Sequence, residues 1–239
     1  IIRDNRINII EKAQVVYQVA KNIMLDVFSD PRSGIHVYRA KNLVEATIDM
    51  IITNKNASLA IINILSFDYY TYSHSVNVAI LGLLFSKYLG IKFEELNVLG
   101  TGLLFHDIGK TQIESEIINK KEKLNEKEFT RIKMHVELGA NILTKVRDID
   151  DVSLFPVRQH HEKCNGKGYP NRLQGDDIHK FGKIASIIDV YDALTTRRSY
   201  ADAKKPFSAL NIMKNEMEGS FDDELFTKFI LFLGQRSEK

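Results

Sequence analysis

Apolar residues recur every three or four positions along almost the whole chain, and this spacing constrains the fold more than any other feature. In the segment 9–28 the apolar residues that follow this spacing are Ala13, Val16, Val19, Ala20, Ile23 and Val27. The same spacing predicts further helices over 40–53, 57–65, 75–89, 93–105, 126–146, 183–194, 207–217 and 222–233. Gly90 and Gly234 follow two of these segments as helix stops, and Pro206 suits a first helical position. Because no convincing strand alternation is present, the sequence predicts an all-α fold.

The 239 residues suffice for one large domain, or for one domain with a helical extension. We expect an N-terminal helical region over residues 1–66 and a second domain over residues 67–239. The first region could be a stalk, a packing extension, a homodimer interface or a link to a sensor domain. Since the chain begins with Ile1 rather than Met, we expect it to be a fragment of a longer protein, in which a regulatory domain could lie upstream.

Charge and cysteine content narrow the class of protein. The 33 basic and 31 acidic residues nearly balance, which does not indicate nucleic-acid binding but leaves room for an anionic substrate held by local cations. No apolar run reaches the roughly 18 residues that a membrane span needs. Cys164 is the one cysteine, so no intramolecular disulfide can form, and we expect a reducing cytoplasm.

Histidines and acids form the most informative pattern. His106 directly precedes Asp107, and His160 directly precedes His161, whereas His36 and His179 look ordinary. Imidazole and carboxylate ligands together suit iron, manganese, zinc or nickel, and the lack of thiolates argues against a soft-metal site. Successive helical residues point about 100° apart, so an adjacent pair can face two neighbouring ions. Two such ions can clamp a phosphodiester and generate hydroxide from water near neutral pH.

Asp189 lies in the apolar stretch 187–192, where a buried acid is costly unless it is paired or binds a metal. The alternative is an exposed position on an amphipathic helix. That alternative fits Asp192 better than Asp189, so we expect Asp189 alone to belong to the site.

These residues, taken in order, resemble a known signature. His74, His106–Asp107 and Asp189 are similar to the H…HD…D pattern of the HD phosphohydrolase superfamily, and residues 160–170 look like the HHExxDGxGYP motif of its HD-GYP subgroup. The resemblance covers roughly residues 60 to 205. It implies an HD-domain helical bundle that hydrolyses the bacterial second messenger c-di-GMP to pGpG or GMP by a metal-activated hydroxide.

The resemblance also implies a role for each matched residue. The implied metal ligands are His74, His106, Asp107, His135, His160, His161 and Asp189. The implied catalytic residues are Asp107, as a bridge between two ions, and Lys110, as the contact to the scissile phosphate. The implied substrate-binding residues are Lys110, Gly168, Tyr169, Pro170 and Arg198. Glycine permits close approach of a ligand, and a tyrosine ring can stack on guanine. We expect iron or manganese, with zinc or nickel as alternatives.

The chain departs from the family pattern at three positions. Asn165 replaces a frequent aspartate, Ala201 stands where a basic residue is expected soon after Tyr200, and Tyr70 occupies the position of a glutamate found in trinuclear members. The last departure predicts two ions rather than three. Three alternatives stay open: a c-di-GMP receptor that does not hydrolyse its ligand, an HD phosphohydrolase for another nucleotide such as a different cyclic dinucleotide, and a purely structural bundle.

Overall fold

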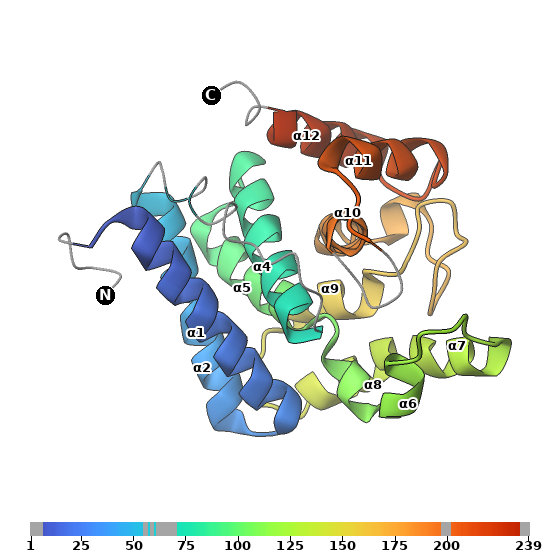
Figure 1. Ribbon diagram of the computed structural model, residues 1–239, viewed down its shortest axis with the longest axis horizontal. Coiled ribbons are helices and arrows are strands. Elements are labelled where there is room, and N and C mark those ends of the chain that lie inside the picture. Colours follow the sequence, from blue (N-terminus) through green and yellow to red (C-terminus); the bar gives the residue numbers. More distant parts are fainter. Residues whose placement is uncertain (1–6, 55–56, 58–59, 61–70, 197–201, 235–239) are drawn as a thin grey trace.

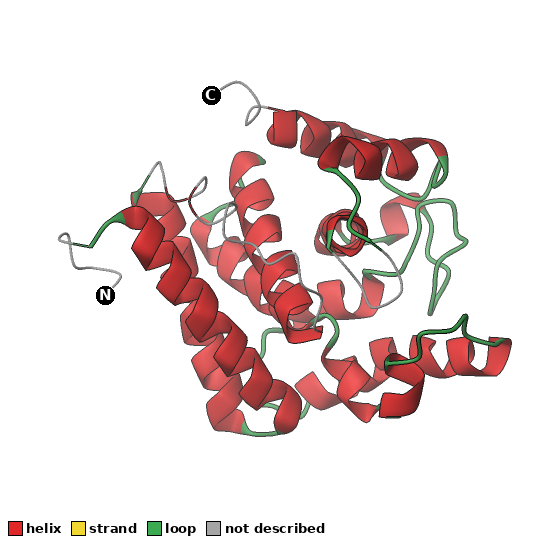
Figure 2. Cartoon of the chain, viewed as in Figure 1, coloured by secondary structure: helices red, strands yellow, loops and turns green. Residues whose placement is uncertain are grey.

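The computed structural model describes residues 7–54, 57, 60, 71–196 and 202–234, and all regular structure within these ranges is helical (Figures 1 and 2). Among the described residues, the β-type pairing is limited to one isolated bridge between Asn165 and Gln174. The all-α expectation is therefore confirmed. No helix in these ranges is both long and apolar enough to cross a membrane.

Four long helices form one side of the molecule. Helices α1 (Ile9–Ser29) and α2 (Gly34–Thr53) make a hairpin, with α1 packing on α4 (Thr71–Tyr88) and α2 packing on α5 (Phe93–Phe105) (Figure 1). Tyr17 of α1 donates its hydroxyl to the Asn77 amide oxygen of α4, and the two atoms are 2.9 Å apart. The hairpin thus packs on the helices that lead to His74 and His106.

The remaining elements are shorter and enclose the other side. They are η1 (Ile108–Gln112), α6 (Ser115–Ile118), α7 (Glu126–Lys133), α8 (His135–Leu143), η2 (Asp151–Ser153), α9 (Leu154–Gln159), η3 (Gly175–Asp177), α10 (Lys180–Thr195), α11 (Pro206–Asn215) and α12 (Asp223–Gly234). Helix α10 contacts α4, α9, α11 and α12, so it is surrounded on most of its faces (Figure 1).

One continuous hydrophobic core joins these elements. Near the C-terminal ends of α4 and α10, aromatic side chains link these two helices to α12. The ring centroids of Phe85 and Phe229 are 5.2 Å apart, and those of Tyr191 and Phe229 are 5.1 Å apart. Edge-to-face contacts of this kind add to the free energy of burial. The ends of α4 and α10 are therefore fixed against α12.

Some predicted boundaries were wrong. The single helix predicted over 126–146 divides at Met134, whose N–H donates to the Arg131 carbonyl oxygen in a tighter 3₁₀-type turn. Helix α2 begins six residues before the predicted 40, and α9 was not predicted. The segment predicted over 57–65 lies largely outside the described residues. So does the 66/67 domain boundary, which stays a prediction, as does a homodimer through the N-terminal helices.

Candidate metal centre

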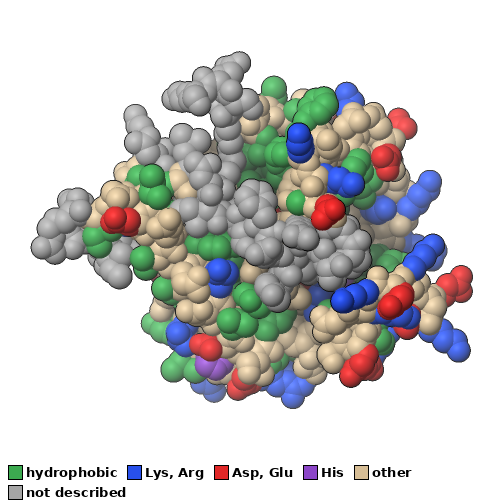
Figure 3. All heavy atoms as spheres, viewed as in Figure 1, with side chains coloured by type: hydrophobic (Ala, Val, Ile, Leu, Met, Phe, Trp, Pro, Cys, Tyr) green, Lys and Arg blue, Asp and Glu red, His purple; other side chains and the backbone are tan. Residues whose placement is uncertain are grey.

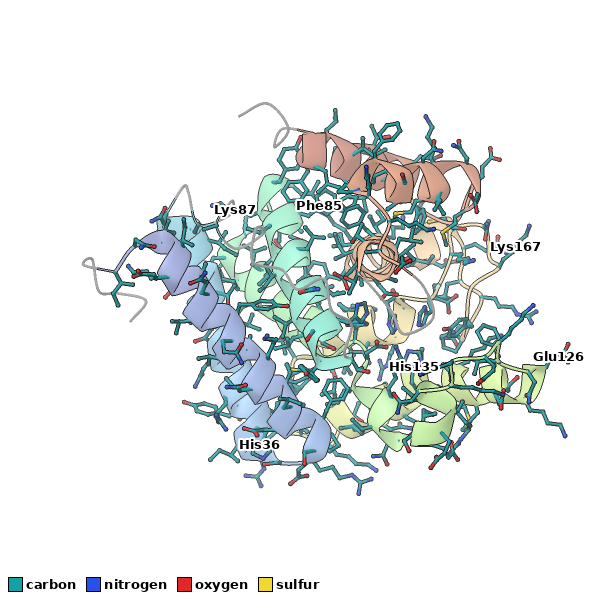
Figure 4. The ribbon with its side chains drawn as sticks, viewed as in Figure 1. His36, Phe85, Lys87, Glu126, His135 and Lys167 are labelled. Carbon is teal, nitrogen blue, oxygen red and sulfur yellow. The ribbon has the colours of Figure 1, made fainter. Side chains whose placement is uncertain are left out.

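Five elements deliver the predicted metal ligands to one buried place. Helix α4 carries His74, the end of α5 carries His106, the first residue of α8 is His135, the end of α9 carries His160, and α10 carries Asp189. Asp107 follows His106 directly. All of these side chains are buried, and Figure 4 labels His135 where it enters the interior of the bundle. His161 lies beside them with 26% of its side chain exposed.

Close packing of two glycines brings Asp107 next to α8. A Cβ atom on Gly109 would lie 1.9 Å from the His135 carbonyl oxygen and 2.5 Å from the Gly139 nitrogen. Only glycine therefore fits at this crossing of η1 with α8. The crossing sets the distance between Asp107 and the His135 ring.

The two carboxylate oxygens of Asp107 face different histidines. Oδ2 lies 3.7 Å from His74 Nε2 and 3.5 Å from His106 Nε2. Oδ1 lies 3.3 Å from His135 Nε2 and 3.8 Å from His160 Nε2. Two clusters of donor atoms therefore share this one carboxylate; their members are His74, His106 and Asp107 in cluster A, and Asp107, His135, His160 and His161 in cluster B.

Hydrogen bonds at the outer nitrogens fix the ring orientations. The Nδ1 atoms of His106, His135 and His160 bond the carbonyl oxygens of Leu103, Ile132 and Pro156 at 2.7, 2.7 and 2.8 Å. A carbonyl oxygen only accepts, so each Nδ1 carries the proton and each neutral ring presents a lone pair at Nε2. These lone pairs point inward, where His135 Nε2 and His160 Nε2 are 3.2 Å apart. Two lone pairs this close repel each other, and a cation bound between the two Nε2 atoms would turn this repulsion into attraction.

Burial keeps these rings neutral. Desolvation lowers the pKa of His135 and of His160 to about 4, and it also lowers the pKa of His106. Burial raises the pKa of the Asp107 carboxyl, but the Lys110 ammonium and the neighbouring histidines outweigh it and hold that pKa well below its usual value. Neutral imidazole and ionised carboxylate are the metal-binding forms of both groups.

Asp189 completes the buried set near cluster A. Its Oδ1 lies 2.9 Å from His74 Nε2 and 3.8 Å from His106 Nε2, and its Oδ2 lies 4.0 Å from His161 Nδ1. Burial raises the pKa of the Asp189 carboxyl, but its contact with His74 Nε2 and the nearby histidines outweigh burial and hold that pKa well below its usual value.

Asp192 was predicted to be an exposed residue, and that prediction was wrong. The residue is 4% exposed, and its Oδ2 accepts a hydrogen bond from His74 Nδ1 at 2.7 Å. Because α10 is covered on most of its faces, two acids three residues apart can both point inward. A carboxylate behind a histidine ligand orients the ring and raises its basicity.

The donor set fits divalent metal ions. Asp107 Oδ1 is buried and has no hydrogen-bond partner among the described residues, which is costly for a charged oxygen unless a cation lies beside it. The two buried His/Asp clusters are consistent with a binuclear site, and imidazole with carboxylate suits first-row transition metals. Lys110 donates to Asp107 Oδ2, so a cation of the chain already sits at this carboxylate.

The loop after α9 forms a wall beside cluster B. The Tyr169 ring stacks on His161 with centroids 4.6 Å apart, and Lys133 Nζ lies 5.3 Å from the Tyr169 centroid and 4.5 Å from the Phe129 centroid. Gly168 is required because a Cβ there would lie 2.5 Å from the Lys163 nitrogen.

Glu162 holds the same loop from inside the protein. Its carboxylate is buried and accepts from the backbone N–H groups of Asn171 and Leu173 at 2.7 and 3.1 Å. Asn165 keeps its turn, because its side-chain oxygen accepts from the Lys167 N–H at 3.1 Å. Pro170 lies between these two anchored stretches, directly after Tyr169.

The described residues test only some of the other residues that the sequence singled out. Arg198, Ala201 and Tyr70 fall outside the described residues. His179 stacks on Phe155 with centroids 3.9 Å apart, as an ordinary packing residue does. Sequence reasoning missed Asp192 and Lys133. The HHE run already contained Glu162, but no role was assigned to it.

Comparisons with known proteins find one matching family model and several curated relatives. A family model described as "HD domain" matches residues 73–225. A cyclic di-GMP phosphodiesterase of Pseudomonas aeruginosa is 31% identical over 229 residues, which cover 94% of this chain and 55% of that protein. A 3′3′-cGAMP-specific phosphodiesterase of Vibrio cholerae is 39% identical over 133 residues, which cover 55% of this chain and 26% of that protein. The chain thus spans about half the length of the first relative and about a quarter of the second.

The fold also has a close counterpart among solved structures. An HDG"Y"P protein of Bdellovibrio bacteriovorus, Bd1817, superposes with a TM-score of 0.80 at 19% identity, covering 97% of this chain and 74% of that chain. At this identity the likeness concerns the fold, and it includes the N-terminal hairpin as well as the histidine-bearing helices.

Proposed function

The chain belongs to the HD domain family, as a relative of phosphodiesterases for cyclic dinucleotides, and we propose that it is a metal-dependent phosphodiesterase that hydrolyses c-di-GMP. One observation carries the proposal: the two oxygens of the buried Asp107 face two separate sets of histidine nitrogens. A carboxylate shared between two imidazole sets can bridge two adjacent metal ions, which supports a two-metal site.

The proposed ligands divide between the two clusters. His74, His106 and Asp189 would hold one ion, His135, His160 and His161 would hold the other, and Asp107 would bridge them. Iron or manganese is the first choice and zinc or nickel the alternative. When bound, two such ions activate water as the nucleophile and offset the charge of the phosphodiester.

The chain's own residues would position the substrate and stabilise charge. Lys110 lies at Asp107 with 19% of its side chain exposed, so its ammonium can approach a phosphate while staying beside the clusters. A fixed cation at this place stabilises negative charge that develops during hydrolysis. Asp107 and Lys110 are therefore the proposed catalytic residues, and Asp192 is a positioning residue that holds the His74 ring.

The wall formed by the loop after α9, which contains Gly168, Tyr169 and Pro170, supports the proposal of a nucleotide substrate. Gly168, Tyr169 and Pro170 are the proposed substrate contacts, together with Arg198, which lies outside the described residues. Lys133 adds a cation at the Tyr169 ring, where a base and a phosphate could be held together.

A second cyclic dinucleotide is the competing substrate. The relative from Vibrio cholerae is specific for 3′3′-cGAMP and is more identical to this chain, over a shorter match, than the c-di-GMP phosphodiesterase. We favour c-di-GMP because that relative matches nearly the whole chain. Since c-di-GMP is an intracellular messenger, the proposal includes a cytoplasmic location.

Metal analysis and turnover together test the proposal. Purified metal-loaded protein is given c-di-GMP, 3′3′-cGAMP and c-di-AMP, and the products are identified as linear dinucleotide or mononucleotide. The variant with His106→Ala and Asp107→Ala should lose bound metal and all turnover. His36→Ala, in α2 and far from His135 in Figure 4, should retain both. Tight c-di-GMP binding without products would favour the receptor, and intact turnover in the double variant would exclude the proposed site.

A further inference from the structure

A second concave surface lies outside the histidine clusters, between the start of α2 and the segment that follows α8. It encloses a cavity of about 290 Å³. Arg32, Tyr38 and Lys41 line it from the hairpin, and Lys145, Arg147 and Asp148 line it from the segment after α8. We call this surface the basic cavity.

The charge of the basic cavity is strongly one-sided. Four cationic side chains and one carboxylate line it, so four positive charges less one negative charge leave a net of +3. The whole chain of 239 residues carries only +2. A concave surface with an excess of one sign focuses its field and concentrates ions of the opposite sign.

These cations have no carboxylate partners within the part of the chain that the structure describes. Lys41 donates to the backbone carbonyl oxygen of Asp148, which leaves its charge uncompensated, and Arg32, Lys145 and Arg147 form no ion pair there. Some cations elsewhere in the described chain do lie beside acids; examples are Arg39 with Asp26, Lys120 with Glu128, Arg131 with Glu114 and Lys183 with Asp222. Acidic and basic side chains are likewise mixed around α6 and α7 in Figure 3.

The walls between the cations are partly apolar. Val37 is a buried lining residue, and Tyr38, which also lines the cavity, is 63% exposed. An exposed tyrosine ring beside cations offers a flat surface for a planar base, while arginine and lysine bind phosphate oxygens through charge-assisted hydrogen bonds.

We propose that the basic cavity is a second ligand site, which binds a nucleoside polyphosphate with its phosphates among Arg32, Lys41, Lys145 and Arg147 and its base on Tyr38. The net charge of +3 matches a polyphosphate better than a single carboxylate, which one arginine fork would satisfy. A ligand here would join α2 to the segment after α8. Helix α8 begins at His135 of cluster B and spans nine residues, so a helix about 13 Å long separates this histidine from the cavity-lining segment that follows α8.

Calorimetric titration of the full chain with GTP and with inorganic tripolyphosphate tests the proposal. Each titration is run on metal-stripped and on metal-loaded protein, because phosphate bound by the histidine clusters would depend on metal. The variant with Lys145→Glu and Arg147→Glu should weaken GTP binding about tenfold or more, since two phosphate contacts are replaced by repulsion. Lys214→Glu, an exposed lysine of α11, is the matched control and should leave the affinity unchanged.

The outcomes separate the parts of the proposal. Metal-independent GTP binding, weakened by the charge reversal and by Tyr38→Ala, supports it. Equal affinity for GTP and tripolyphosphate overturns the nucleoside assignment, and metal-dependent binding or an unaffected double variant overturns the site itself. If the charge-reversed protein does not fold, Lys145→Gln with Arg147→Gln replaces it. Because none of these readouts is turnover, the result is independent of whether the chain hydrolyses c-di-GMP.

Discussion

Replacement of Asp192 by asparagine should weaken metal binding at cluster A while leaving the fold intact. The carboxylate accepts a hydrogen bond of 2.7 Å from His74 Nδ1, between atoms that are both buried. Asparagine keeps the size of the side chain but removes the charge. It can also turn its NH₂ group toward Nδ1, which then favours the tautomer with the proton on Nε2, where the metal should bind.

The expected size of the effect follows from the contact. A hydrogen bond to a charged group is worth about 1.5–3 kcal/mol. At about 1.4 kcal/mol for each factor of ten, its loss corresponds to an affinity about 10- to 100-fold weaker. Partners behind metal-binding histidines generally have effects of this size.

Titration of metal-stripped protein with Mn²⁺ measures this effect, with bound metal counted after dialysis. Wild-type protein should take up two ions, and Asp192→Asn should hold one of them more weakly. Asp151→Asn, an exposed acid of η2, should behave as the wild type. Circular dichroism and melting temperature establish that the variants are folded. Two ions bound by Asp192→Asn with wild-type affinity would refute the role given to this carboxylate.

Three further predictions concern stability and substrate binding. In metal-stripped protein the pKa values of His135 and His160 are about 4, against about 6.5 when unfolded, so the unfolded state binds more protons between these values. The free energy of unfolding should therefore fall by on the order of a few kcal/mol as the pH drops through that window, and urea unfolding at about pH 7 and about pH 5 measures it; equal stabilities contradict it. Gly109→Ala should lower the melting temperature sharply or abolish folding, because its Cβ would meet the His135 carbonyl oxygen at 1.9 Å. Gly234→Ala, whose Cβ would have no described atom within 4 Å, should melt as the wild type does. Lys133→Met should raise KM for the cyclic dinucleotide several-fold with a smaller change in kcat. An unchanged KM in steady-state kinetics would show that Lys133 does not contact the substrate.

The helical class and the candidate ligands could be predicted because both leave local marks in the sequence. Helical spacing is a property of neighbouring residues, and acids or histidines inside apolar stretches need partners wherever the chain folds. The pairs His106–Asp107 and His160–His161 stand out in the amino-acid sequence, whereas His74 and His135 were predicted through the resemblance to the HD-GYP pattern. The fold brings these residues together around Asp107.

Other features depended on contacts between distant segments. Asp192 reads as a surface acid because its neighbours in sequence do not reveal that α10 is covered on most sides. Helix α9 is only six residues long and contains Pro156, so periodicity could not identify it. The start of α2 at Gly34 was missed because glycine is a poor helix former, although Val37 in the first turn is buried.

The bond between Tyr17 and Asn77 has a practical consequence for anyone who shortens this chain. Asn77 lies three residues after His74 on α4, and the hairpin helix α1 supplies a partner for its amide oxygen. A fragment trimmed to the family match at residues 73–225 would lose that partner and would leave apolar surface of α4 and α5 in water. Although no described residue of the hairpin belongs to the histidine clusters, a minimal active fragment should begin before α1.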